Sequence, residues 1–215
     1  MMKVTYHLPG SLGTAETDEI FRFRYRVFVE EQGINDPFAD HKAKSLSDPL
    51  DETAYHITAR HNGALIGTGR ANIVADGIYP MARTLFQIED FEAPEEQVTV
   101  GLSTRLMIAK TERAGFATLK IMTEGLKVML LREAEWCLAV CRPELEDFFT
   151  RMGYVIHARD LVHPVFGNRS LMKYNVNDPP RTHSVIAAKG YKAAREEAAK
   201  QKLADPKSTV SPASK

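Results

Sequence analysis

The sequence predicts a mixed α/β sandwich, because two contrasting patterns follow each other along the chain. In the first half, residues 55–60 and 64–73 alternate in polarity around His61-Asn62-Gly63, the pattern of a β-hairpin with a tight turn. In the second half, strand-like and helix-like runs alternate from residue 98 to residue 176. A meander followed by such alternation implies helices packed around one mixed sheet.

The composition allows one sizeable core and disfavours two classes of partner. The chain has 215 residues, of which 44% are hydrophobic, and its formal net charge is zero. General binders of nucleic acid or anionic membranes usually carry a basic excess, so we expect neither function. No apolar run approaches the roughly 18 residues that span a bilayer, and residues 1–10 lack a signal-peptide core. We therefore expect a cytoplasmic protein without a transmembrane segment.

The only two cysteines, Cys137 and Cys141, lie four residues apart beside a predicted strand. They could form half of a metal site or be two buried thiols. A zinc site of this kind needs a second Cys/His pair with ligand spacing, and the sequence has none. We expect buried thiols and no metal.

The N-terminal region predicts an edge strand at residues 4–8 and a helix that begins at Thr17 or Asp18 and ends at Gly33. Three arginines alternate with the aromatic residues of this helix: Arg22, Arg24 and Arg26. They could lie on a solvated face, with their stems along apolar surface. Alternate positions do not share one helical face, so we expect at least one arginine to point inward or into a cleft.

Two irregular stretches flank the hairpin. Residues 35–50 are polar and aperiodic, which predicts a long loop, and residues 76–96 are irregular apart from a small apolar group. Within the second hairpin strand, Gly67 and Gly69 indicate a bulge or the close approach of another backbone.

Residues 98–117 combine a buried strand, a short turn and the start of a helix that runs from about residue 114 to residue 135. Such a junction can hold phosphate, because backbone N–H groups and the helix dipole point at the anion. The remaining predicted elements are strands at 136–140, 154–156 and 168–176, and a helix between Pro143 and Gly153.

The composition changes after residue 178. Residues 187–204 are rich in Ala, Lys and Glu with little apolar face, and residues 205–215 are polar. We expect an exposed helix and a frayed tail, which could serve as a partner-docking element. The chain thus divides into a domain at 1–176 and a charged helical extension at 177–215.

Several motifs, in this order and spacing, resemble the GNAT acyltransferase superfamily. RYRVFVEEQG (residues 24–33) resembles its first helix, GALIGTGR (63–70) its second hairpin strand, and FFTRMGYV (148–155) a segment near its C-terminus. The resemblance implies a mixed, mostly antiparallel sheet flanked by helices in three layers, with splayed central strands and an acyl-thioester donor. It covers roughly residues 20–176.

Within the superfamily, a subset of residues looks like the N-acyl amino acid synthase and acyl-homoserine-lactone synthase branch. That likeness implies a set of residues that binds the acceptor: Arg24, Phe28, Asp48, Asp51, Phe86 and Ser103. Arg70 and Arg105 also match the branch. The central strand departs from the lactone synthase pattern, because Leu102 replaces the glutamate of E-x-S-R.

The donor-binding loop departs as well, since Glu112 stands where Gln or Arg is usual. The likeness implies donor contacts from Met107, Ile108, Arg113, Gly115 and Ala117, with a backbone N–H near Met107 or Ile108 as the oxyanion donor. A carboxylate would repel the CoA pyrophosphate unless Arg113 turns in. The alternative donor is an acyl carrier protein, whose pantetheine carries a single phosphate.

Four side chains are candidates for the chemistry: Arg70, Arg105, His56 and Glu31. The groups available as the base are Glu30, Glu31, Asp51 and His56. His56 could instead be structural, and water can serve as the base in reactions of this type. Because Arg70 and Arg105 occur in apolar strand sequence, each should have a carboxylate partner. The partner is either an internal aspartate, Asp48 or Asp51, or the carboxylate of an acceptor.

These inferences lead to an N-acyltransferase that moves an acyl group, favoured to be long, from CoA or an acyl carrier protein to a small amine such as an amino acid. The alternatives are an acetyl-CoA-dependent acetyltransferase and a non-catalytic binding or regulatory module. Apolar residues of the long helix could line an acyl tunnel or simply form core: Phe116, Met122, Met129 and Leu130. A monomer and a homodimer are both compatible with the sequence.

Overall fold

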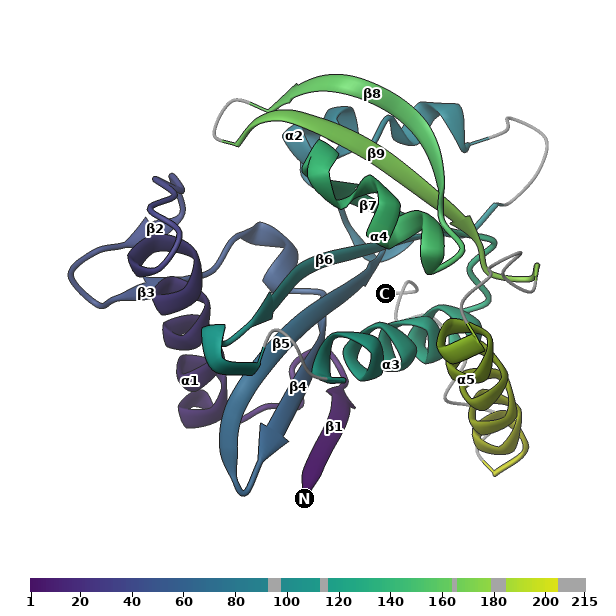
Figure 1. Ribbon diagram of the computed structural model, residues 1–215, viewed down its shortest axis with the longest axis horizontal. Helices are drawn as coiled ribbons and strands as arrows, with labels where there is room; N and C mark the ends of the chain where they lie inside the picture. The colour runs from purple at the N-terminus through teal and green to yellow at the C-terminus, as the bar shows by residue number, and fades with distance from the viewer. Residues whose placement is uncertain (93–97, 113–115, 164–165, 179–184, 205–215) are drawn as a thin grey trace.

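The computed structural model describes residues 1–92, 98–112, 116–163, 166–178 and 185–204. Its main strands are β1 (Met2–His7), β4 (Tyr55–His61), β5 (Ala64–Ile73), β6 (Val100–Ile108), β7 (Trp136–Cys141), β8 (Val155–His163) and β9 (Gly167–Asn175). They form one seven-stranded sheet in the order β1-β4-β5-β6-β7-β9-β8 (Figure 1). Only β6 and β7 pair in parallel. The predicted mixed, mostly antiparallel sheet is confirmed.

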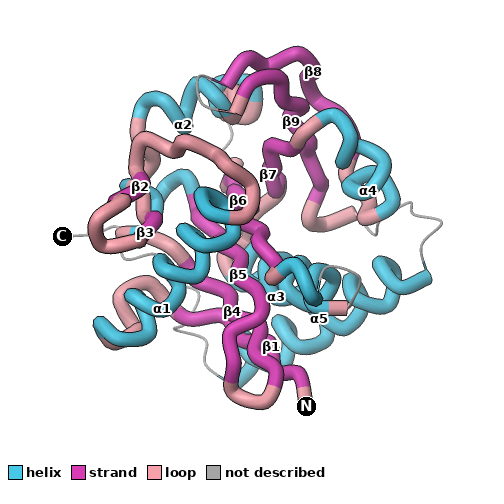
Figure 2. The backbone as a smooth tube through the Cα atoms, turned by 60° about the vertical axis from the view of Figure 1, so that its left-hand side comes forward, coloured by secondary structure: helices cyan, strands magenta, loops and turns pink. Residues whose placement is uncertain are grey.

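Helices cover both faces of the sheet and make three layers (Figures 1 and 2). One face carries α1 (Thr14–Tyr25), continued by a π-helical turn (Arg26–Glu30), and α2 (Pro80–Leu85); the other carries α3 (Ala117–Leu131), α4 (Glu146–Arg151) and α5 (Val185–Ala204). Successive side chains of a strand point to opposite faces of the sheet, so each strand contributes side chains to the packing on both faces. Met107 packs among the α1 side chains, whereas the next residue, Ile108, packs among those of α3.

The central strands separate, as expected. β6 and β7 pair only from Val100–Trp136 to Leu102–Leu138, and beyond this point each strand pairs only with its other neighbour. In β6, Arg105 and Leu106 together oppose a single residue of β5, which is a β-bulge, and Arg105 has a left-handed φ of 52°. A bulge bends its strand, so β6 turns away from β7 and opens a gap in the sheet.

The hairpin is confirmed, and its glycines have the expected role. Asn62 and Gly63 have φ of 50° and 85°, the positive values that a tight primed turn needs. A Cβ on Gly69 would lie 2.5 Å from Cγ2 of Ile121 in α3. Gly69 therefore combines both alternatives: it lies opposite the bulge, and it allows α3 to approach the sheet.

Several boundaries differ from the predictions. α1 begins at Thr14, capped by Gly13, rather than at Thr17 or Asp18. The loop at 35–50 contains a small hairpin of β2 (Ala39–Asp40) and β3 (Ser45–Leu46), and the irregular stretch at 76–96 contains α2. Such short elements bury few residues each, so they are too short to show a periodic hydrophobic pattern in the sequence.

The expected C-terminal helix is present, but the prediction that it is exposed is wrong. α5 packs beside α3 (Figures 1 and 2) and buries Tyr191, Ala194 and Ala198. These residues recur at helical spacing, but two of them are alanines, so the buried face carries little hydrophobic signal. The expected tail at 205–215 lies outside the described residues.

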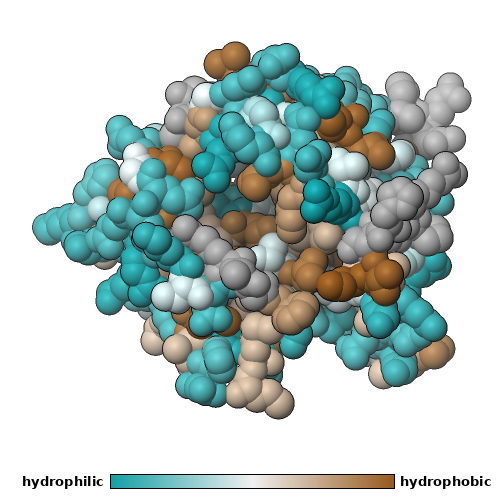
Figure 3. Space-filling view, in the orientation of Figure 1, coloured by the Kyte–Doolittle hydropathy of each residue, from teal (hydrophilic) through white to brown (hydrophobic). Residues whose placement is uncertain are grey.

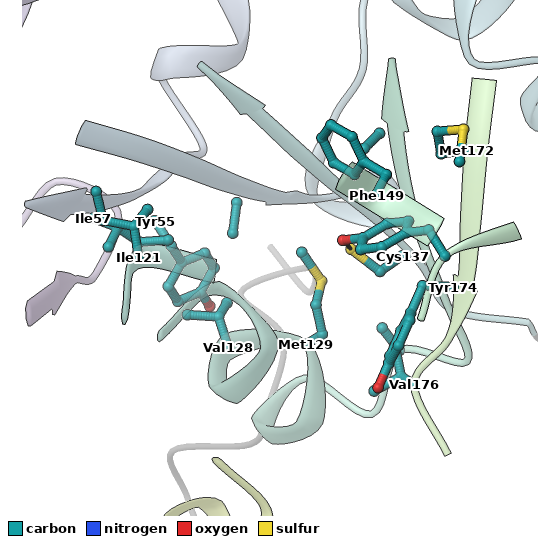
Figure 4. Close-up of a cluster of buried hydrophobic side chains, with 14 of the residues drawn as sticks. Tyr55, Ile57, Ile121, Val128, Met129, Cys137, Phe149, Met172, Tyr174 and Val176 are labelled. Atoms are coloured by element: carbon teal, nitrogen blue, oxygen red, sulfur yellow. Dashed lines mark hydrogen bonds between the residues drawn. The ribbon is translucent and has the colours of Figure 1, made fainter. Parts of the chain in front are cut away.

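The main core lies between the sheet and α3. It joins Tyr55 and Ile57 of β4 to Ile121 and Met129 of α3 and extends to Tyr174 of β9 (Figure 4). Cys137 and Cys141 belong to this core as free thiols, as predicted. In the described ranges, no group of three or more His, Cys, Asp or Glu could hold a metal ion. None of the described helices has the length and apolar character needed to cross a bilayer.

Candidate active site

A buried ion network lies on the α1 face of the sheet, beside the bulge in β6. Its arginines come from α1, β5 and β6, and its aspartates from the segment between α1 and β4: Arg24, Arg70, Arg105, Asp36, Asp48 and Asp51. Three positive charges thus balance three negative charges. The balance matters because an unpaired charge at this depth would cost several kcal/mol.

Asp48 joins the two strand arginines. Its Oδ1 accepts from Nη1 of Arg70 at 2.7 Å, and its Oδ2 accepts from Nη2 of Arg105 at 2.6 Å. The same Oδ1 accepts the backbone N–H of Leu50 and so caps a short 3-10 turn (Pro49–Asp51). Burial opposes ionisation, but the two guanidinium groups lower the pKa of Asp48 below its ordinary value. Asp48 is therefore a carboxylate at neutral pH.

Asp51 and Arg24 form the deepest pair, at 2.7 Å, and the Arg24 side chain is 0% exposed. Arg24 and Arg70 together hold the pKa of Asp51 well below its usual range, despite its burial. Arg24 is the inward-pointing arginine that the alternate spacing predicted. Its second Nη donates to Nδ1 of His56 at 3.2 Å.

His56 is neutral in this environment. Burial and the neighbouring Arg24 guanidinium lower the pKa of His56 from 6.5 to about 4. Because Arg24 donates to Nδ1, the proton of the neutral ring lies on Nε2. This arrangement supports a structural role for His56 beneath the network.

The His56 environment predicts acid sensitivity. Between pH 6.5 and pH 4 the unfolded chain protonates this ring and the folded chain does not, so stability should fall as the pH falls through this window, by about 3 kcal/mol at most. Urea unfolding of wild type and His56→Gln across this range should show a shallower slope in the variant. The exposed His61→Gln is the control, and equal slopes in all three proteins would contradict the buried neutral ring.

Arg105 is the member of the network nearest the solvent: its side chain is 10% exposed, against 3% for Arg70. It donates to Asp48 from Nε and Nη2 and to Asp36 from Nη1. Its guanidinium lies over the Phe28 ring, 5.6 Å from the centroid. Two of its five N–H groups have no acceptor among the described residues, so Arg105 retains capacity for an anionic ligand.

Aromatic residues enclose the Arg105 side of the site. Phe28 contacts Phe166 edge to face at 5.4 Å, and His163 stacks on Phe166 at 4.2 Å. These two residues lie at the tip of the β8–β9 hairpin, which arches over β6 towards α1 (Figure 1). This side of the network therefore combines a cationic group with apolar walls.

An apolar pocket lies on the opposite face, where β6 and β7 separate. It is small, about 60 Å³, and partly open to solvent, and it lies between the strand gap, α3 and α5. Its apolar lining includes Met122, Leu126 and Met152. In Figure 3 the middle of this face is hollowed, and hydrophobic surface gathers nearby. The lining suits an apolar ligand group.

Three polar groups lie where the pocket meets the strand gap: Ser103 of β6, Cys137 of β7 and Tyr154. The Tyr154 hydroxyl lies 3.4 Å from Sγ of Cys137, and Ser103 lines the same end of the pocket. Burial raises the pKa of Tyr154 well above its usual range and that of Cys137 to about 11. Both groups keep their protons at neutral pH, so this end of the pocket offers hydrogen-bond donors.

The other predicted site residues are more dispersed. Phe86 lies in the core beneath α2, and Glu31 is exposed at the end of the π-helical turn. Met107 and Ile108 lie past the bulge, where β6 has left β7, and Ala117 is the buried first residue of α3. Arg113 and Gly115 fall outside the described residues. The oxyanion and pyrophosphate contacts stay predictions.

Sequence reasoning missed Asp36 and Tyr154. Asp36, between Asn35 and Pro37, looks like a turn residue, yet it is 2% exposed and accepts from Arg105 at 3.0 Å. A charge count could have found it, because three inward arginines need three carboxylates. Tyr154 gave no signal beyond its place in a strand, and only the fold brings it to the gap.

Comparisons with known proteins agree with this geometry. Residues 19–175 match the model of a protein family described as N-acyl amino acid synthase FeeM. The solved structure of FeeM from uncultured soil microbes has a TM-score of 0.65 at 16% identity, covering 85% of this chain and 96% of that chain. The acyl-homoserine-lactone synthase LasI gives 0.66 at 20% identity, covering 88% and 95%.

A third solved structure is BjaI, a CoA-dependent acyl-homoserine-lactone synthase with SAM and isopentyl-CoA. It gives a TM-score of 0.65 at 14% identity, covering 93% of this chain and 89% of that chain. The sequence has no significant match among curated proteins. At these identities the solved structures show the fold, and the family match carries the assignment. The chain belongs to the FeeM family of N-acyl amino acid synthases and is an acyltransferase.

Proposed function

We propose that this enzyme transfers a long acyl chain from a thioester, on CoA or an acyl carrier protein, to the amine of an amino acid or a similar anionic acceptor. One observation carries the proposal: the gap between β6 and β7 has an apolar pocket on one face and the Arg105 guanidinium beside it on the other. A chain and a charged head can thus approach the same gap from opposite sides.

The pocket supports the choice of a long acyl chain. Its lining is apolar, so each methylene buried against Met122, Leu126 and their neighbours contributes about 0.8 kcal/mol. None of the described residues that line it carries a charged side chain. A pocket of this kind therefore favours binding of longer acyl chains.

Arg105 supports an acceptor with a carboxylate. Asp36 and Asp48 fix the guanidinium from one side, and two N–H groups without an acceptor among the described residues remain for a ligand. Arginine pairs carboxylates through two parallel hydrogen bonds, so it can orient as well as attract the acceptor. Phe28 and Phe166 offer apolar surface to the rest of an amino acid.

The reaction needs little from side chains. The neutral amine attacks the thioester carbonyl, the C–N bond forms, the C–S bond breaks, and the nitrogen proton passes to solvent. Backbone N–H groups of the splayed part of β6, near Met107 and Ile108, are the candidates to stabilise the oxyanion. Ser103 and Tyr154 can donate hydrogen bonds to the departing sulfur, while His56 is occupied by Arg24 and Glu31 is exposed. We therefore favour water as the base.

The test separates binding from turnover. Purified protein is screened by thermal shift against acetyl-CoA, octanoyl-CoA, palmitoyl-CoA and a palmitoyl carrier protein, and thiol release is then followed with each of the common amino acids. A donor at about 100 times its Kd should stabilise the fold by roughly 2.7 kcal/mol. We expect long-chain donors to stabilise most, and an N-acyl amino acid to appear by mass spectrometry.

The other outcomes each contradict part of the proposal. Stabilisation and turnover with acetyl-CoA alone would indicate an ordinary acetyltransferase. Binding of a long-chain donor without thiol release for any amine would contradict turnover under the proposed chemistry. A preference for the carrier protein over palmitoyl-CoA would identify the donor without changing the reaction.

A further inference from the structure

The C-terminal helix α5 lies outside the residues that match the family, yet it forms part of the acyl pocket. The family match ends at residue 175, and α5 begins at Val185. Ile186, Ala187 and Tyr191 of α5 line the pocket together with Met122 and Leu126 of α3. The pocket thus runs from the strand gap, at Ser103 and Cys137, to a wall that lies outside the family match.

That wall is firmly held against α3. A Cβ on Gly190 would lie 2.8 Å from Oγ1 of Thr123, so glycine allows the two helices to approach closely. Further along, Ala194 and Ala198 are buried, and Nζ of Lys127 lies 3.5 Å from a carboxylate oxygen of Glu197. Small residues and cross-helix contacts thus fix the position of α5.

Tyr191 is the most constrained side chain of the wall. It is 7% exposed, and its hydroxyl donates to the carbonyl of Val176 at 3.2 Å. The same hydroxyl accepts from Nη1 of Arg195 at 3.1 Å, and the Arg195 guanidinium lies over the ring. A ring anchored at both ends cannot swing aside to admit a longer ligand.

We propose that α5 closes the acyl pocket opposite the strand gap and sets the longest acyl chain that the enzyme accepts, with Tyr191 as the end stop and Ala187 as the adjoining wall. The inference rests on the proposed function, because it assumes that the pocket holds the acyl chain. It goes further by assigning chain-length specificity to a segment outside the family match.

A matched pair of substitutions on α5 tests this role. Ala187 faces the pocket, whereas the next residue, Ala188, is exposed. Ala187→Phe should fill the distal pocket, abolish the thermal stabilisation by palmitoyl-CoA and leave that by acetyl-CoA unchanged. Ala188→Phe should behave like wild type, since it adds the same side chain on the solvent side.

Tyr191→Ala should shift the donor preference towards longer acyl chains. Each additional methylene admitted should improve donor affinity by about fourfold, so affinity should continue to rise beyond the chain length at which wild type levels off. The melting temperature without ligand shows whether this variant folds. If it does not, the Ala187/Ala188 pair still decides the question.

The outcomes distinguish the two proposals. If wild type binds acyl-CoAs with a length optimum that Ala187→Phe does not move, α5 is not the determinant and the proposed function stands. If no acyl thioester stabilises wild type, the proposed function fails and this inference falls with it. Equal loss of palmitoyl-CoA binding in both phenylalanine variants would point to a general disturbance of α5 and would also overturn the inference.

Discussion

Replacing Asp48 by alanine should lower the free energy of unfolding by about 3–5 kcal/mol, the largest loss we expect from any single change in this chain. Asp48 is the carboxylate shared by Arg70 and Arg105, and its side chain is 3% exposed. Its removal leaves Arg70 with Asp51 alone and strands part of the positive charge in the core. It also removes the cap of the 3-10 turn. Chemical denaturation measures the effect.

Two comparisons separate these contributions. Asp48→Asn keeps the shape and the capping oxygen but removes the charge. The loss of stability in this variant therefore measures the contribution of the ion network. Glu30→Ala breaks an exposed ion pair with Lys44 of similar length, 2.8 Å, and should cost far less, because solvent screens this pair. A loss at Asp48 no greater than that at Glu30 would contradict a tightly coupled buried network.

The sequence was most informative where charges occur in apolar surroundings. Arg70 and Arg105 stand in strand sequence, and the cost of an unpaired buried charge predicted partners for both. The structure supplies Asp48 to both. Internal aspartates are thus confirmed as partners, whereas an acceptor carboxylate at Arg105 stays a prediction, supported by two N–H groups of Arg105 that have no acceptor among the described residues.

The fold was predictable wherever a long periodic segment carried the signal. The hairpin at β4 and β5, the strand β6 and the helix α3 all lie close to their expected positions, because each buries a continuous face. α5 was misjudged for the opposite reason: its buried face consists of Tyr191 and two alanines, which pack closely but contribute little hydrophobicity.

Other features depend on distances that no sequence pattern reports. Phe86 matched an acceptor-binding position, yet it packs beneath α2 in the core. The bulge at Arg105 is a relation between two strands, and the approach of Phe166 to Phe28 depends on how far the β8–β9 hairpin bends. These long-range relations build the walls of the site, which is why sequence reasoning found its charges but not its shape.

Replacing Arg105 by lysine should reduce kcat/KM for the acceptor by about 10- to 100-fold while leaving the KM of the acyl donor nearly unchanged. Lysine keeps the positive charge beside Asp36 and Asp48 but loses the planar pair of donors, and a hydrogen bond to a charged group contributes roughly 1.5–3 kcal/mol. The melting temperature should fall much less than in Asp48→Ala. Steady-state kinetics with the best amino acid acceptor measures the effect.

A change of acceptor makes this test specific to the carboxylate. Wild type should strongly prefer the amino acid over its decarboxylated amine, whereas Arg105→Lys should discriminate between them far less, because only the carboxylate uses the missing hydrogen bonds. Arg60→Lys is the matched control, since Arg60 makes two hydrogen bonds to Glu19 at the surface, away from the gap. If Arg105→Lys retains both its stability and the wild-type preference, Arg105 serves the buried network alone and the acceptor carboxylate is bound elsewhere.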